Sequence, residues 1–181
     1  VLKALNQTLA NPLPPDRVME IAASLGSDVP FFLSAPTALV GGRGECIRAL
    51  DYAAPYAVVL VNPGIHSDTG SAFGLMDKVR SEKGLNLSVP LGESGMEKGL
   101  FAEVGQWPFY NDFLSLFLRY GSTKEQRVYQ EILEGLAVCG ADFTGLSGSG
   151  STCFGVFIDH KQAKDAEKSL SAVWEYVHLS F

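Results

Sequence analysis

The chain has 181 residues, hydrophobic side chains at 46% of positions and a formal net charge of −6. This length and composition allow a sizeable core and favour one domain, or one domain and part of a second. The acidic balance lacks the basic footprint of proteins that bind nucleic acid or anionic membranes, and no apolar stretch reaches the roughly 20 residues of a membrane span. We therefore predict a cytoplasmic protein without nucleic-acid or membrane partners.

The three cysteines, Cys46, Cys139 and Cys153, lie far apart in the sequence. They form no C-x-x-C pair, and no histidine lies at ligand spacing from any of them. A disulfide framework and a zinc site are therefore not expected, and the site prediction includes no metal ligand. The simplest interpretation is three reduced and mostly buried thiols.

The first third of the chain predicts short helices followed by strands. A helical pattern is already in progress at Val1, without an N-cap or an initiating Met, so the sequence looks like a piece of a longer chain. The predicted elements are a helix over 1–9, a helix over 16–24 that ends at Gly26, strands over 37–40 and 46–50, and a buried strand over 57–61. We place a soft domain boundary near Val61.

After Val61 helices dominate, until strands return near residue 142. The predicted helices are one within 67–80, entered from a loop, one over 111–119, one that begins with a Ser122–Glu125 capping box, and one over 161–170. The helix with the capping box carries an apolar stripe of Val128, Ile132 and Leu136. The predicted strands are 142–146, 153–158 and 174–179. Residues 81–108 show only weak periodicity. The final hairpin, crossover helix and strand form half of a split βαβ arrangement, which predicts an α+β fold in two layers.

The strongest local signal is the loop Leu146-Ser-Gly-Ser-Gly-Ser-Thr152. Glycines let a backbone approach an anion, and successive N–H groups can form a concave nest for it, to which the Ser and Thr hydroxyls add donors. An ordinary hairpin loop needs the same small residues for conformational reasons alone, so that alternative stays open. The chain contains no P-loop motif, and no G-x-G-x-x-G opens a helix after a strand.

A single carboxylate, Asp28, follows the helix-ending Gly26 and precedes the apolar segment Val-Pro-Phe-Phe. Apolar neighbours can leave a carboxylate partly desolvated at the bottom of a cleft, where it could accept a proton from a hydroxyl. The alternative is that Asp28 caps a short following turn, with Val29 and Phe31 as ordinary core residues.

Thr69 stands at a predicted helix start, and Phe73 lies one turn further on the same face. A hydroxyl and an aromatic ring at this spacing suit polar and stacking contacts to a nucleotide base, whereas the alternative is an N-cap followed by a core Phe. The segment Asn111-Asp112-Phe113 allows a similar pair of interpretations, a polar contact to a cleft or the start of a helix.

The order and spacing of these motifs resemble one family, the 4-diphosphocytidyl-2-C-methyl-D-erythritol kinases of the galacto-, homoserine, mevalonate and phosphomevalonate (GHMP) kinase superfamily. The resemblance runs from residue 1 to about Phe157 and rests on residues 25–32, 42–45, 63–73, 111–113, 140–141 and 146–152. It implies a two-layer, GHMP-kinase-like fold with a ferredoxin-like split βαβ C-terminal domain. Residues 1–61 would be the remainder of the N-terminal, ATP-binding domain without its Gly-rich ATP loop, and residues 62–181 the C-terminal domain.

The resemblance also implies a function. The family uses ATP and Mg²⁺ to phosphorylate the 2-hydroxyl of 4-diphosphocytidyl-2-C-methyl-D-erythritol, a small-molecule substrate of non-mevalonate isoprenoid precursor biosynthesis. Asp28 matches the catalytic Asp that draws the proton from the substrate hydroxyl. Thr69 and Phe73 match contacts to the cytidine end, where Phe73 stacks on the cytosine. The residues that match a Gly-rich turn beside the phosphate-handling centre are Ser147, Gly148, Ser149, Gly150 and Ser151.

Two departures from the family pattern qualify this implication. The family's ATP loop immediately precedes the segment that resembles Val1 to Asn6, and it is absent from this sequence. Without this loop to hold ATP, the chain by itself is expected to be inactive. Leu114 replaces an acidic residue that commonly follows the Asn-Asp pair, and we transfer no catalytic role to that stretch. Two other interpretations stay open: a GHMP kinase for a mevalonate- or homoserine-type alcohol, and a non-catalytic ligand-binding module. The sequence predicts no oligomeric state.

Overall fold

The computed structural model describes residues 1–44, 46–83 and 91–181, which fall into two compact units, Val1–Ala54 and Pro55–Phe181. The boundary that we predicted near Val61 therefore needs a correction. The buried strand before Val61 pairs with two strands of the second unit, and its backbone hydrogen bonds bind it there. Glu45 of the motif at 42–45, and residues 84–90 of the weakly periodic stretch, lie outside the described residues.

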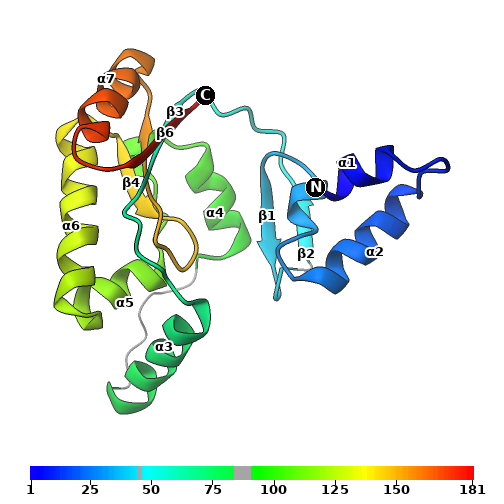
Figure 1. Ribbon diagram of the computed structural model, residues 1–181, viewed down its shortest axis with the longest axis horizontal. Helices are drawn as coiled ribbons and strands as arrows, with labels where there is room; N and C mark the ends of the chain where they lie inside the picture. Colours follow the sequence, from blue (N-terminus) through cyan, green and yellow to red (C-terminus); the bar gives the residue numbers. More distant parts are fainter. Residues whose placement is uncertain (45, 84–90) are drawn as a thin grey trace. The chain divides into compact units, whose positions relative to one another are not determined.

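The first unit contains two helices, a 3-10 turn and a two-stranded antiparallel sheet (Figure 1). In chain order they are α1 (Leu2–Gln7), α2 (Pro15–Leu25), η1 (Phe31–Leu33), β1 (Ala38–Gly41) and β2 (Cys46–Ala49). α2 begins with a proline, which suits a first turn, and ends at Gly26 as predicted. Val18 and Ala22, one turn apart on the helix, are buried, whereas Ile21 is 37% exposed.

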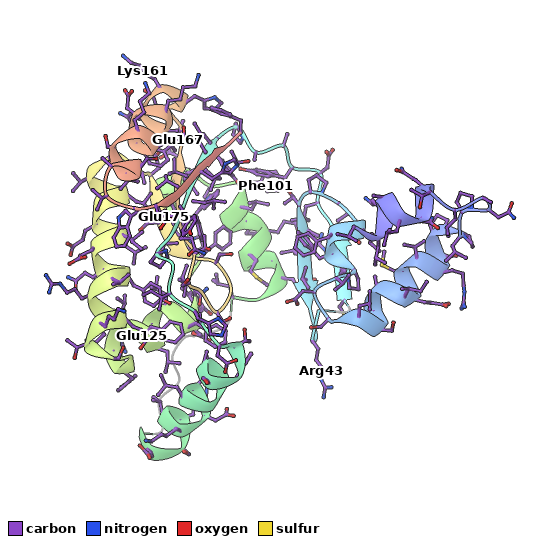
Figure 2. All side chains as sticks on the ribbon, viewed as in Figure 1. Arg43, Phe101, Glu125, Lys161, Glu167 and Glu175 are labelled. Carbon is purple, nitrogen blue, oxygen red and sulfur yellow. The ribbon has the colours of Figure 1, made fainter. Side chains whose placement is uncertain are left out.

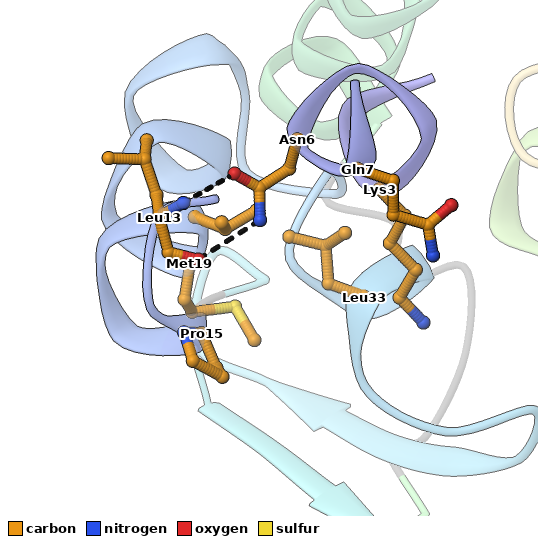
Figure 3. Close-up of a pocket in the computed structure, with 8 residues that line it drawn as sticks. Lys3, Asn6, Gln7, Leu13, Pro15, Met19 and Leu33 are labelled. Atoms are coloured by element: carbon orange, nitrogen blue, oxygen red, sulfur yellow. Dashed lines mark hydrogen bonds between the residues drawn. The ribbon is translucent and has the colours of Figure 1, made fainter. Parts of the chain in front are cut away.

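Asn6 joins α1 to the start of α2. Its side-chain amide donates to the Leu13 carbonyl (3.0 Å) and accepts from the Leu13 N–H (2.8 Å), as Figure 3 shows. A cavity of about 220 Å³ lies beside this pair, lined by Lys3, Asn6, Gln7, Leu13, Pro15, Val18, Met19 and Leu33. None of the predicted site residues lines this cavity.

The second unit is built on an antiparallel sheet in the order β4-β5-β3-β6. The strands are β3 (Ala57–Asn62), β4 (Phe143–Leu146), β5 (Cys153–Phe157) and β6 (Tyr176–Ser180). β5 and β6 lie on either side of β3, and α7 (His160–Ser171) connects them. This is the predicted split βαβ arrangement, and the strand order is that of a ferredoxin-like sheet, which confirms the α+β prediction.

The remaining helices of this unit come between β3 and β4. They are α3 (Thr69–Lys83), α4 (Glu93–Leu100), η2 (Val104–Gln106), α5 (Asp112–Tyr120) and α6 (Thr123–Val138). α4 and η2 fall within 81–108, where weak periodicity gave no prediction. The capping box of α6 is confirmed: Ser122 Oγ accepts from the Glu125 N–H, and the Glu125 carboxylate, labelled in Figure 2, accepts from the Ser122 N–H.

The core of the second unit lies between the sheet and the helices α6 and α7, which cover one face of it (Figure 1). Val59 and Val61 point toward these helices, and α6 contributes Tyr129, Ile132 and Leu136, all at most 1% exposed. The predicted stripe of α6 was right at Ile132 and Leu136, but the buried residue of the preceding turn is Tyr129 rather than Val128. No helix within the described ranges is both long and apolar enough to cross a bilayer.

The opposite face of β4 and β5 carries aromatic rings. Their centroids lie 5.4–6.2 Å apart in successive contacts among Tyr56, Trp107, Phe109, Phe143 and Phe154. The thiols differ from the prediction, since Cys46 is exposed, Cys139 is half-buried and only Cys153 is fully buried. Cys46 lies in a two-stranded sheet, whereas Cys153 lies in the four-stranded sheet beneath α6 and α7.

Candidate functional site

The Gly/Ser loop, residues 147–152, joins β4 to β5. Its own backbone closes it, because Ser147 N–H donates to Thr152 O and Gly150 N–H donates to Ser147 O, both at 2.9 Å. Gly148 and Gly150 have φ angles of +54° and +89°, which favour glycine. The N–H groups of Gly148, Ser149 and Ser151 make no hydrogen bond to the residues that the structure describes. These donors are therefore available to an anion.

The segment between β3 and α3 holds this loop from one side. Ser67 Oγ donates to the Ser149 carbonyl at 2.5 Å, and Ser151 Oγ donates to the Ile65 carbonyl at 2.6 Å. At the end of β3, the Asn62 side-chain N–H donates to Thr152 Oγ1 at 3.0 Å. Ser151, a predicted site residue, is only 6% exposed, so its hydroxyl anchors the loop instead of facing a ligand.

Asn111 holds the loop from another side and begins α5. Its side-chain oxygen accepts from the N–H groups of Phe113 and Leu114, and its side-chain nitrogen donates to the carbonyls of Leu146 and Gly148, both at 2.8 Å. Of the two interpretations that the sequence left open, the start of a helix is confirmed, and the polar contact to a cleft stays a prediction. One side chain caps the helix and fixes the loop.

Thr69 and Phe73 lie at the start of α3, next to the same loop. Thr69 Oγ1 and Ser149 Oγ are 2.8 Å apart. Phe73 is 52% exposed, and its ring meets that of Phe113 edge-on, with centroids 5.0 Å apart and planes at 85°. The alternative that Phe73 is a core residue is therefore wrong.

Asp68 takes the capping role that Thr69 was considered for. The Asp68 carboxylate accepts from the Ser71 N–H at 2.7 Å. This hydrogen bonding with Ser71 lowers the pKa of Asp68, so the cap remains ionised near neutral pH. The Thr69 hydroxyl is consequently left to contact Ser149.

Asp28 lies in the first unit, in the turn between α2 and η1. Its side chain is exposed and makes no hydrogen bond within the described part of the chain, so within this unit it is neither desolvated nor a cap. The Gly loop between β1 and β2 packs against the same turn: a Cβ on Gly44 would lie 2.5 Å from the Ser27 carbonyl oxygen. Arg43 lies at the tip of that loop (Figure 2).

The structure thus brings Thr69, Phe73 and the Gly/Ser loop together in the second unit. Sequence reasoning did not find the residues that hold them, Asn62 and Ser67. Both lie within or next to the segment 63–73 that resembled the family, but single polar residues at a strand end carry no signal of their own. Asn111 could be recognised as a helix start, although its contacts with the loop could not be predicted.

Comparisons with known proteins identify the class. Residues 94–175 match the family described as GHMP kinases C terminal. A crystal structure of homoserine kinase from Cytophaga hutchinsonii is similar in fold, with a TM-score of 0.56 and 17% identity over 99% of this chain and 62% of that chain. These two matches indicate the fold of a GHMP kinase, the first by its family description and the second by fold alone.

Closer relatives narrow the class. A crystal structure of 4-(cytidine 5'-diphospho)-2C-methyl-D-erythritol kinase has a TM-score of 0.71 and 26% identity over 98% of this chain and 60% of that chain. The 4-diphosphocytidyl-2-C-methyl-D-erythritol kinases of Treponema pallidum (strain Nichols) and Geobacter sp. (strain M21) are 33% and 35% identical over 86% and 92% of this chain, and 53% and 55% of their own lengths. The chain belongs to this kinase family and spans about half the length of these relatives.

Proposed function

We propose that the chain carries the cytidine- and phosphate-binding parts of an ATP-dependent kinase for the 2-hydroxyl of 4-diphosphocytidyl-2-C-methyl-D-erythritol, in non-mevalonate isoprenoid biosynthesis. One observation carries the proposal. Thr69, at the helix start that would contact the cytidine, lies 2.8 Å from Ser149 of the loop that would handle phosphate. A base and a diphosphate joined in one molecule need these two sites side by side.

Phe73 is the proposed stacking surface for the cytosine. Its ring is half exposed, and Phe113 supports it edge-on, so a face of Phe73 is not used by that contact. Stacking of a base on an aromatic side chain contributes about 1–3 kcal/mol. The Thr69 hydroxyl, one turn away, would add a hydrogen bond to the same end of the substrate.

The Gly/Ser loop is the proposed phosphate-binding element. The free N–H groups of Gly148, Ser149 and Ser151, with the hydroxyls of Ser147 and Ser149, can donate to phosphate oxygens. Fixed donors of this kind stabilise the charge that develops during phosphoryl transfer. For Mg²⁺, the described residues contain no cluster of three or more ligating side chains, and the proposal assigns none of them to the metal.

Asp28 is the proposed general base. Its carboxylate would accept the proton of the substrate hydroxyl while that oxygen forms its bond to the γ-phosphoryl group supplied by ATP. Exposure within the first unit leaves both carboxylate oxygens available for this contact.

Titration of the ¹⁵N-labelled chain with cytidine diphosphate and, separately, with inorganic pyrophosphate tests the proposal by NMR. Cytidine diphosphate should shift the amide signals of residues 69–73 and 148–151, and pyrophosphate only those of the loop. Phe73→Ala should weaken cytidine diphosphate binding about tenfold, from the loss of stacking, with little effect on pyrophosphate.

Phe101→Ala is the matched control, because Phe101 is also exposed and belongs to the same unit. An equal loss of cytidine diphosphate affinity in both variants would contradict the stacking role. Binding of pyrophosphate without any response to the cytidine compound would favour a GHMP kinase for a small alcohol. Absence of both responses would contradict the whole proposal.

A further inference from the structure

The phenol of Tyr129 ends against the Gly/Ser loop. Tyr129 lies on α6 and is 1% exposed. A Cβ on Gly150 would lie 2.9 Å from the Tyr129 hydroxyl and 3.5 Å from Ser67 Oγ. Both hydroxyls therefore lie beneath the same loop glycine, and Ser67 in turn donates to the Ser149 carbonyl.

We propose that Tyr129 is a positioning residue for the reaction, which acts through Ser67 to hold the Gly/Ser loop in its anion-binding conformation. This inference rests on the phosphate-binding role proposed above. Ser67 Oγ uses its proton for the Ser149 carbonyl, so it can only accept from the phenol. The hydrogen bonds then run from the Tyr129 O–H to Ser67 and from the Ser67 O–H to the loop backbone.

The peptide unit between Ser149 and Gly150 is held at both ends, and Ser67 holds one of them. The carbonyl of the Ser149–Gly150 peptide is held by Ser67, and its N–H donates to Ser147 O. Because a peptide unit is planar, these two bonds set its orientation. The free N–H groups of Ser149 and Ser151 belong to the peptide units on either side of this fixed one.

Packing alone does not account for a tyrosine at this position. The ring stacks on Phe117, with centroids 5.6 Å apart and planes at 27°, and a phenylalanine would make the same contact. A buried hydroxyl without a partner is unfavourable, so its presence indicates a use for it. Burial is the main cause that raises the pKa of Tyr129. The phenol is consequently a hydrogen-bond donor throughout the neutral range.

Tyr129→Phe and Ser67→Ala test the relay, because each removes one hydroxyl and little else. Three quantities would be measured on the chain: the amide signals of residues 148–151, the affinity for pyrophosphate, and the unfolding midpoint in urea. Each variant should shift the loop signals without ligand and bind pyrophosphate about fivefold more weakly, as expected for one lost hydrogen bond. The double variant should lose little more, since both changes break the same relay.

Tyr120→Phe is the control, because it removes a phenol hydroxyl at the end of α5 beside a separate core cluster of Met76, Val79 and Leu116. It should leave the loop signals and the pyrophosphate affinity unchanged. Unaltered loop signals in Tyr129→Phe would overturn the inference, even if the unfolding midpoint fell. If the wild-type chain failed to bind pyrophosphate, the phosphate role would fall, and loop shifts in Tyr129→Phe would still establish the positioning.

Discussion

The two compact units differ in how far each fixes its own site residues. In Pro55–Phe181, the side chains of Asn62, Ser67 and Asn111 hold the Gly/Ser loop over a core of buried residues. In Val1–Ala54, Asp28 is exposed and has no hydrogen-bond partner within the described residues. Two motifs of one family pattern can therefore differ in how firmly their own unit holds them in place.

The largest expected effect is the loss of kcat on substitution of Asp28, the residue that has no hydrogen-bond partner within the described residues. Asp28→Asn removes the proposed proton acceptor but keeps the size of the side chain, and general-base help typically contributes ~10²–10⁴ in rate. We expect kcat to fall by about this factor in a protein in which the chain replaces the matching half of the Treponema pallidum relative. Because Asp28 is exposed, the unfolding midpoint should not change.

The control in that protein is Asp16→Asn, since Asp16 is also exposed and lies in the first turn of the neighbouring α2. It should leave kcat within about twofold of the parent protein, since it changes only a helix-terminal charge. Turnover by Asp28→Asn at the level of this control would remove the general-base role. A large loss of stability in Asp28→Asn would instead mean that the first unit does depend on this carboxylate.

A second prediction concerns the glycines of the better supported loop. Gly150→Ala places a Cβ 2.9 Å from the Tyr129 hydroxyl at a φ of +89°, whereas Gly148→Ala, at a φ of +54°, meets nothing within 4 Å. Both carry the backbone cost of a positive φ, about 1–2 kcal/mol, but only Gly150→Ala adds a steric conflict. We expect Gly150→Ala to lower the free energy of unfolding by about 2–3 kcal/mol, clearly more than Gly148→Ala, as measured by urea denaturation.

The Tyr129→Phe background tests whether the hydroxyl causes the additional loss of stability in Gly150→Ala. Without the hydroxyl, the Cβ that Gly150→Ala introduces has more room, so the difference between the two alanine variants should shrink in that background. An unchanged difference would show that the strain at Gly150 comes from the backbone and not from Tyr129.

Local patterns predicted most elements of the fold, because their causes are local. The capping box at Ser122 and the strand at 57–61 depend on neighbours in the sequence, and both are present. Tyr129 was missed because hydrophobic spacing does not say which of two adjacent residues faces the core. The support of the loop by Asn62, Ser67 and Asn111 could not be predicted, since these contacts join positions 35 to 90 residues apart. Asp28 was recognised by its motif, but the expected desolvation is absent within its unit.

The smallest expected effect is a difference in alkylation between one thiol of each unit, Cys46 and Cys153. Cys46 is exposed, whereas burial raises the pKa of Cys153 from 9.0 to about 12. Thiolates are the reactive form, so iodoacetamide at pH 8 should label Cys46 and leave Cys153 unmodified until the second unit unfolds, as read by mass spectrometry of the peptides.

Burial of the Cys153 thiol also makes the free energy of unfolding depend on pH. Well below pH 9 the Cys153 thiol is neutral in both states, but between about pH 9 and 12 the unfolded chain loses this proton while the folded chain keeps it. The unfolded state is then favoured, so the free energy of unfolding should fall by up to about 1.4 kcal/mol per pH unit on account of this group. Other groups titrate in the same range, and Cys153→Ala separates them, because its stability should decline less steeply between pH 9 and 10.5. Equal slopes for the two proteins would mean that water reaches the Cys153 thiol in the folded state.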